Sequence, residues 1–225
     1  MKKHTILVYS MLAIITGLLI WILVKLHSFD NRVNKIGFML TEQTMLNVPK
    51  QVREVSIDDG NSFSMGDSSV PVTAILFFDY ECDFCKLFFV NTFPQIEEQL
   101  INTGKLRFVF RHFPIEMHPN AYIAAEMSEQ ARQQGKFLEM HNELVRTDNL
   151  SKENLIRIAN ELNVDTTNWR SNSQSVEKIN TDKSVGESIF VRGTPTFIIN
   201  GKMYTGMRTF EEFKEISEMD KLDNI

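Results

Sequence analysis

Residues 72–85 are Val72-Thr73-Ala74-Ile75-Leu76-Phe77-Phe78-Asp79-Tyr80-Glu81-Cys82-Asp83-Phe84-Cys85, an apolar run that leads into a C-x-x-C motif. Near-continuous apolar character is typical of a central strand covered on both faces, so we expect a strand from Val72 to Phe78. Cys82 and Cys85 are the only cysteines in the 225 residues. Their spacing allows the two sulfurs to close one small ring or to bind one soft metal ion.

The segments around the motif predict a strand–helix–strand unit. A helix should begin at the C-x-x-C motif and extend towards Asn102, with Pro94 as a kink or break within it. Alternating apolar residues in Lys105–Phe110 predict the next strand, and Val52–Ile57 is a candidate edge strand before the motif. A C-x-x-C motif in a βαβ context is typical of thioredoxin-like redox domains.

The chain from residue 119 to residue 188 has helical patterning throughout. Ser151 is a candidate N-cap for the third of four expected helices, and Ser171 or Ser173 for the fourth. Four helices are too many for a single crossover, so we predict a helical subdomain at about residues 115–188, inserted into a smaller α/β unit. The expected helices are Ala121–Gln133, Lys136–Arg146, Lys152–Leu162 and Gln174 to Ser188.

The C-terminal part predicts a hairpin followed by a helix. Asn200-Gly201 suits a type I′ turn, because both residue types tolerate positive φ. Thr209 and Glu212 form a capping box at the start of the last helix. These elements are the strands Thr196–Ile199 and Lys202–Thr205 and the helix Phe210–Met219.

The N-terminal part carries a predicted membrane anchor. Thr5–Val24 contains 20 residues without a charge, enough for a helix to cross a hydrocarbon core of about 30 Å. A cleavable signal peptide is the alternative, but this run is longer than the usual ~7–15 residues and lacks a small-residue cleavage site. We expect a signal-anchor transmembrane helix at residues 1–25, a juxtamembrane stalk at 26–50 and the domain at 51–225.

Both alternatives export the domain, so its expected location is extracytoplasmic, on the periplasmic or extracellular face of a bacterial inner or plasma membrane. Residues 26–225 contain 21 Lys and Arg and 29 Asp and Glu, a net charge of −8. A nucleic-acid partner calls for a basic face instead. An oxidising compartment lets a disulfide persist, although a ring this small closes almost no loop and adds little stability.

A metal site is not expected. A structural zinc site requires four ligands, and the chain has no second cysteine pair. His112, His118 and His141 are scattered along the chain and are expected on the surface or in loops. We therefore predict no metal and no cofactor other than the redox-active cysteine pair.

The start of a helix should make the two cysteines unequal. Cys82 faces unpaired N–H groups and the positive end of the helix dipole, which lower the pKa of a thiol. Cys85 lies one turn further in, on the same side, and is less accessible. Cys82 is therefore the expected nucleophile, which forms mixed disulfides that Cys85 resolves; a purely structural disulfide is the alternative.

Three motifs together resemble the DsbA-like thiol:disulfide oxidoreductases. The resemblance covers about residues 52–220 and implies a thioredoxin-like fold with an inserted helical domain. It also implies that Pro195 is a cis-proline facing the cysteine pair, with Thr194 before it. Reduced or unfolded exported proteins would be the clients, and a quinone-linked membrane protein the reoxidant. The motifs are Phe77-Phe78-Asp79-Tyr80-Glu81-Cys82-Asp83-Phe84-Cys85, Arg111-His112-Phe113-Pro114 with His118-Pro119, and Gly193-Thr194-Pro195-Thr196-Phe197-Ile198-Ile199-Asn200-Gly201.

The dipeptide between the cysteines departs from the family pattern. It is Asp83-Phe84, where the family usually has proline first and strong oxidases often have histidine second. An acidic neighbour should disfavour the Cys82 thiolate and make the protein a milder oxidant. Asp83 and the exposed ring of Phe84 are expected to contact the client, together with Thr194 and Pro195.

Two acidic residues precede the cysteines. Asp79, at the end of the strand, is a candidate proton acceptor for Cys85, whereas Glu81 is expected in solvent. The predicted function is exchange of the Cys82–Cys85 disulfide with clients, most directly the introduction of disulfides during oxidative folding. The alternatives are a reductase or isomerase of the same fold and a non-catalytic thioredoxin-like chaperone or binding module.

Overall fold

The computed structural model describes residues 53–219, together with residues 18, 21 and 25. The chain divides into two compact units, residues 1–49 and 50–225, and the second contains all the elements discussed below. Apart from those three positions, the predicted anchor and stalk lie outside the described residues. No helix among the described residues is both long and apolar enough to cross a membrane.

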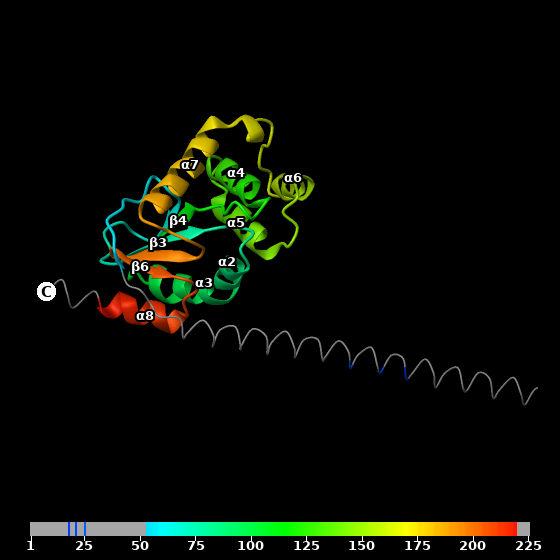
Figure 1. Ribbon diagram of the computed structural model, residues 1–225. Helices are drawn as coiled ribbons and strands as arrows, with labels where there is room; N and C mark the ends of the chain where they lie inside the picture. Colours follow the sequence, from blue (N-terminus) through cyan, green and yellow to red (C-terminus); the bar gives the residue numbers. More distant parts are fainter. Residues whose placement is uncertain (1–17, 19–20, 22–24, 26–52, 220–225) are drawn as a thin grey trace, which may run out of the picture. The chain divides into compact units, whose positions relative to one another are not determined.

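A mixed six-stranded sheet with the order β1-β6-β5-β3-β4-β2 forms the centre of the domain (Figure 1). β3 (Thr73–Phe78) lies in the middle, parallel to β4 (Arg107–His112) and antiparallel to β5 (Thr196–Ile199). The remaining strands are β6 (Lys202–Thr205), β1 (Arg53–Glu54) and β2 (Ser64–Met65). The predicted central strand is confirmed, the predicted edge strand is reduced to β1, and the sequence did not predict β2.

The chain after Cys82 is helical without interruption up to Ile101. It consists of α2 (Asp83–Leu87), a π-helical turn (Phe88–Thr92), α3 (Phe93–Ile96) and a second π-helical turn (Glu97–Ile101). Pro94 has no N–H to donate, and it lies in the first turn of α3, between the two wider turns. The predicted helix with an irregularity at Pro94 is confirmed.

Four helices lie between β4 and β5, as predicted. Ser151 caps the third of them, and its hydroxyl accepts a hydrogen bond from the Asn154 N–H at 3.4 Å. The cap of the fourth is Asn172 and not Ser171 or Ser173, because the Asn172 side chain accepts from two N–H groups of the first turn. The helices are α4 (Ala121–Arg132), α5 (Phe137–Arg146), α6 (Lys152–Glu161) and α7 (Ser173–Ser188).

Helices cover both faces of the sheet (Figure 1). α3 and α8 (Phe210–Met219) lie against one face, and α7 lies against the other. The side chains of β3 alternate between these faces. Ala74, Leu76 and Phe78 join the larger apolar cluster, whereas Ile75 and Phe77 join the smaller one. The larger cluster also contains both cysteines, so the C-x-x-C motif borders a buried, largely aromatic core.

The predicted C-terminal hairpin and capping box are both confirmed. β5 and β6 are antiparallel neighbours, and the turn residues Asn200 and Gly201 have φ angles of 45° and 78°. The Glu212 N–H donates to the Thr209 hydroxyl at 3.3 Å, and the Thr209 N–H donates to the Glu212 carboxylate at 3.0 Å. The hairpin holds β5 beside β3, and this pairing brings the C-terminal motif to the cysteines.

Candidate active site

Cys82 occupies the N-cap of α2, directly after the turn that follows β3. Its backbone is extended, with φ −76° and ψ 115°, and its N–H donates to the Asp79 carbonyl at 3.3 Å. Its own carbonyl accepts the Lys86 N–H at 3.0 Å, which closes the first helical turn. The side chain therefore starts where the first N–H groups of a helix have no backbone acceptor.

The second part of the site comes from the segment that enters β5. Sγ of Cys82 lies 3.2 Å from the carbonyl oxygen of Thr194, 112 positions away in the sequence, and donates to this oxygen while the thiol carries its proton. The Thr194–Pro195 peptide bond is cis, so the predicted cis-proline is confirmed. The Thr194 hydroxyl is buried without a hydrogen-bond partner of ordinary geometry. Thr194 therefore lies at Cys82, and Pro195 follows it directly through the cis bond.

The two thiols are free and chemically unequal. Cys82 is 6% exposed and Cys85 is 1% exposed. A hydrogen bond from the Cys85 thiol, supported by Thr194 and by backbone N–H groups of α2, outweighs burial and lowers the pKa of Cys82 to about 6. Burial, together with the hydrogen bond and charge of Cys82, raises the pKa of Cys85. At neutral pH the outer sulfur is a thiolate and the inner one a thiol.

The carboxylate of Asp79 is buried and makes three hydrogen bonds. Oδ1 accepts the Glu81 N–H at 2.7 Å, and Oδ2 accepts the Ile115 N–H at 2.8 Å. Oδ2 also lies 2.8 Å from Nδ1 of His118. None of the described hydrogen bonds of this carboxylate involves a cysteine, and its role as proton acceptor for Cys85 stays a prediction.

A second acid attaches the loop between β4 and α4 to the same turn. Glu81 accepts the Asn120 N–H at 2.7 Å and the Asn120 side-chain amide at 3.2 Å. The expectation that Glu81 is solvated was wrong, because this loop lies against it. His118 is a loop residue, as expected, but it binds Asp79 and belongs to the site. Its only sequence signal was the His118-Pro119 motif, since its partner lies 39 positions away.

The dipeptide between the cysteines is only partly exposed. Asp83 is exposed in the first turn of α2, whereas Phe84 is half-buried and packs against the larger core. The expectation of an exposed Phe84 ring was wrong to that extent, because α2 lies directly on the aromatic cluster. None of the principal causes of the lowered pKa of Cys82 involves the Asp83 carboxylate. The largest contributions that lower this pKa come from Cys85, Thr194 and the start of α2.

The family model described as Thioredoxin matches residues 58–218, which include both cysteines, the loop with His118 and the cis-proline. The chain belongs to the thioredoxin family. A crystal structure of α-DsbA1 from Wolbachia pipientis superposes with a TM-score of 0.64 at 24% identity, over 76% of this chain and 97% of that one. The predicted thioredoxin-like α/β fold with a helical region is thus confirmed.

Two curated proteins are similar in sequence to this thioredoxin-family domain, and the domain covers a different share of each of them. It is 33% identical to the Na(+)/H(+) antiporter NhaA 3 of Salinispora tropica over 162 residues, or 70% of this chain and 24% of that protein. The chain spans about a quarter of the length of the first curated relatives it matches. It is 24% identical to the Disulfide bond formation protein D of Bacillus subtilis over 169 residues, or 69% of this chain and 75% of that protein.

Two further histidines were expected on the surface or in loops, but they lie in the interior of the thioredoxin-family domain. His112 and His141 are 1% and 2% exposed. Nε2 of His112 lies 3.0 Å from Oε1 of Glu129, and Nδ1 of His141 lies 3.0 Å from the Tyr80 hydroxyl. Burial lowers the pKa of His141 to about 3, so this ring is neutral at physiological pH. The expectation failed because each partner lies on a different element.

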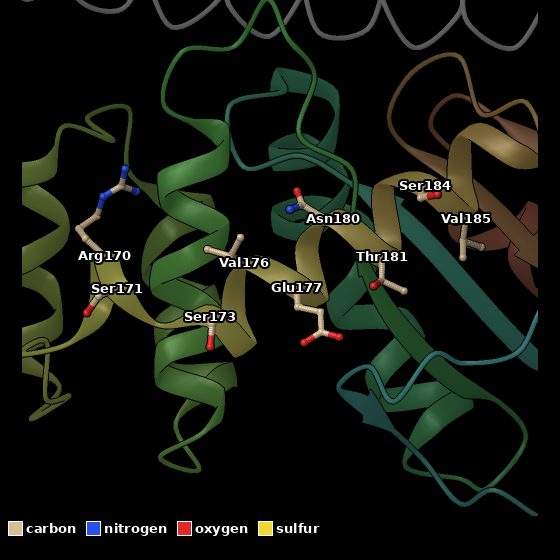
Figure 2. Close-up of a pocket in the computed structure, with 9 residues that line it drawn as sticks. All are labelled: Arg170, Ser171, Ser173, Val176, Glu177, Asn180, Thr181, Ser184 and Val185. Carbon is tan, nitrogen blue, oxygen red and sulfur yellow. The ribbon is translucent and has the colours of Figure 1, made fainter.

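A surface groove of about 730 Å³ runs along α7 and the turn before it (Figure 2). Its lining consists mostly of short polar side chains, and neither cysteine contributes to it. In the described part of the chain, no group of three His, Cys, Asp or Glu side chains is arranged to hold a metal ion.

Proposed function

We propose that the protein is an extracytoplasmic thiol:disulfide oxidoreductase that exchanges the Cys82–Cys85 disulfide with client proteins. One arrangement carries the proposal: Cys82 lies at the N-cap of α2, 3.2 Å from the Thr194 carbonyl oxygen, with the Cys85 thiol buried one turn further in. In this arrangement the pKa of Cys82 is lowered and the pKa of Cys85 is raised. Exchange through a mixed disulfide needs a thiolate nucleophile beside a resolving thiol. Membership of the thioredoxin family supports the same reaction.

The reaction in the oxidising direction takes two steps. A client thiolate attacks Sγ of Cys82, the Cys82–Cys85 bond breaks, and Cys85 leaves as a thiolate that takes up a proton. A second client thiolate then attacks the client sulfur of the mixed disulfide, and Cys82 leaves as the stabilised thiolate. Two electrons pass from the client to the protein, one client disulfide forms, and the cysteine pair ends reduced.

The other site residues are proposed to hold the client and to move the proton. Thr194 borders the sulfur just before β5, and Pro195 follows it. An extended client chain would find backbone hydrogen-bonding groups there. Asp83 and Phe84 would contact the client beside Cys82. Asp79, buried below the turn, is proposed as the group through which the proton of Cys85 is exchanged.

Oxidation is favoured over reduction, because a stabilised thiolate stabilises the reduced pair and makes the disulfide a stronger oxidant. The Cys82 pKa of about 6 lies between about 7 for thioredoxin and about 3.5 for DsbA. We therefore expect a milder oxidant than DsbA, with a reduction potential between about −270 and −120 mV. Equilibration in glutathione buffers measures it, and a value near −270 mV would favour the reductase or isomerase.

Location and partners extend the proposal. The apolar segment Thr5–Val24 would anchor the protein in a bacterial membrane, with the domain on the outer side and reduced, exported proteins as clients. Reoxidation would require a membrane partner that passes electrons to quinone. Alkylation of Cys82 in intact cells with a membrane-impermeant reagent tests the location; protection that persists until the cells are lysed would contradict it.

Trapping of mixed disulfides tests the function itself. Cys85→Ser removes the resolving thiol, so client proteins should accumulate in disulfide linkage to Cys82 and be released by reductant. Cys82→Ser is the matched control, because it keeps the fold and one thiol but lacks the nucleophile, and it should trap nothing. If Cys82→Ser also keeps cellular function, the protein is a non-catalytic binding module.

A further inference from the structure

Two acids fix the loop between β4 and α4 against the turn that carries Cys82. Asp79 accepts the Ile115 N–H and Glu81 accepts the Asn120 N–H, at 2.8 and 2.7 Å. The same turn is tied to the nucleophile, because the Asp79 carbonyl accepts the Cys82 N–H at 3.3 Å. The loop and the start of α2 therefore form one hydrogen-bonded unit, and His118 lies inside it.

Asp79 fixes the protonation of the His118 ring. Its Oδ2 lies 2.8 Å from Nδ1 of His118 and is an acceptor, so Nδ1 carries a hydrogen. Nε2 is the nitrogen left to gain or lose a proton. The side chain of His118 is 25% exposed, whereas the Asp79 side chain is fully buried. A carboxylate bonded to one ring nitrogen fixes the tautomer and the orientation of a histidine, and the backbone carbonyl of the same Asp79 accepts the Cys82 N–H.

We propose that His118 is the electrostatic partner of Cys82: oriented by Asp79, its imidazolium stabilises the Cys82 thiolate. The inference rests on the proposed function and names the residue that tunes its site. The cation is supplied by a loop remote in sequence, in a chain that has phenylalanine and not histidine between its cysteines. In the exchange described above, His118 would favour Cys82 as the leaving sulfur of the second step. It moves no electrons and forms no bond.

The charges around His118 fit this role. Burial opposes the imidazolium, but the hydrogen bond and charge of Asp79 and the charges of Cys82 and Glu81 outweigh it and raise the pKa of His118. Glu116, two residues earlier in the loop, lies 3.7 Å from Lys183 of α7. The opposite charges of this pair largely cancel at His118. Each acidic group that acts on His118 thus favours its charged form.

Substitution of His118 tests the inference. His118→Asn keeps an N–H donor for Asp79 but cannot become charged, so the pKa of Cys82, followed by thiolate absorbance, should rise. At pH 5 the thiolate fraction and the rate of alkylation should fall in the same proportion. His118→Lys restores a cation and should return the pKa of Cys82 towards its original value. Arg157→Gln removes an exposed charge on α6 and should change neither quantity.

The wild-type protein offers a second measurement that needs no folded variant. Because coupling between two sites is reciprocal, the pKa of His118, measured by NMR, should fall when the Cys82–Cys85 disulfide forms, by as much as His118→Asn raises the pKa of Cys82. An unchanged His118 pKa would overturn the proposal, as would a His118→Asn variant with the original Cys82 pKa. If His118→Asn and His118→Lys changed the pKa of Cys82 equally, the charge of residue 118 would play no part in stabilising the thiolate. These readouts involve no client, so they are independent of the trapping experiment.

Discussion

The lowered pKa of Cys82 should make the stability of the reduced protein depend on pH. This pKa is about 6 in the folded chain and about 8.5 in an unfolded one, so folding favours the thiolate. For a lowered pKa, the stabilisation is fully present above the unfolded value and is lost as pH falls through the folded value. Between pH 5 and pH 8, Cys82 alone should add about 2.5 kcal/mol to the free energy of unfolding, at ~1.4 kcal/mol per pKa unit.

Urea unfolding of the reduced wild-type protein and of the Cys82→Ser variant, each at pH 5 and pH 8, measures the contribution of Cys82 to the free energy of unfolding. Other groups titrate in the same interval, including the buried His141, so the difference between the two proteins isolates Cys82. With a slope of about 2 kcal/mol per molar urea, the wild-type midpoint should rise about 1.2 M more than that of the variant. Equal shifts would refute the lowered pKa. Above about pH 9 the trend should reverse, because folding raises the pKa of Cys85.

Three further predictions concern the fold around the site. Gly186→Ala should lower the free energy of unfolding by about 1–2 kcal/mol, because the added Cβ would lie 2.7 Å from a core phenylalanine ring. Gly193→Ala is the control: an added Cβ there meets nothing within 4 Å, so the loss in the same urea assay should be less than ~0.5 kcal/mol. Equal losses would contradict the packing argument. Ser151→Ala should destabilise the protein by about 1 kcal/mol through loss of the α6 cap, and an unchanged midpoint would exclude that contribution. Glu81→Ala should speed hydrogen exchange of the Asn120 amide, which loses its acceptor; unchanged protection would show that the loop does not depend on this contact.

Elements governed by local chemistry were predictable from the sequence. The apolar run that forms β3, the Asn200-Gly201 turn and the Thr209 capping box each depend on residues within a few positions of one another. The cysteine pair was predictable for the same reason, because both thiols lie in one helical turn. Pro195 required the resemblance to a family, since its position at the site depends on strand pairing with β3.

The side chains that were misplaced depend on contacts between distant segments. His112 and His141 are polar enough to suggest a surface, but inside the core Glu129 binds Nε2 of His112 and the Tyr80 hydroxyl binds Nδ1 of His141. A histidine in the interior is stable when such a partner removes the cost of an unpaired polar group. The sequence did not predict β2, because a strand of two residues is too short to show an alternation of apolar and polar side chains. Only its pairing with β4 defines it.

The assembly of the site from three separate segments also determines when its chemistry begins. The turn with Cys82, the loop with His118 and the entry to β5 at Thr194 meet only once the sheet has closed. Until then Cys82 is an ordinary thiol with a pKa of about 8.5, largely protonated and slow to react at neutral pH. Completion of the fold therefore lowers the pKa of Cys82 and makes its sulfur more reactive at neutral pH.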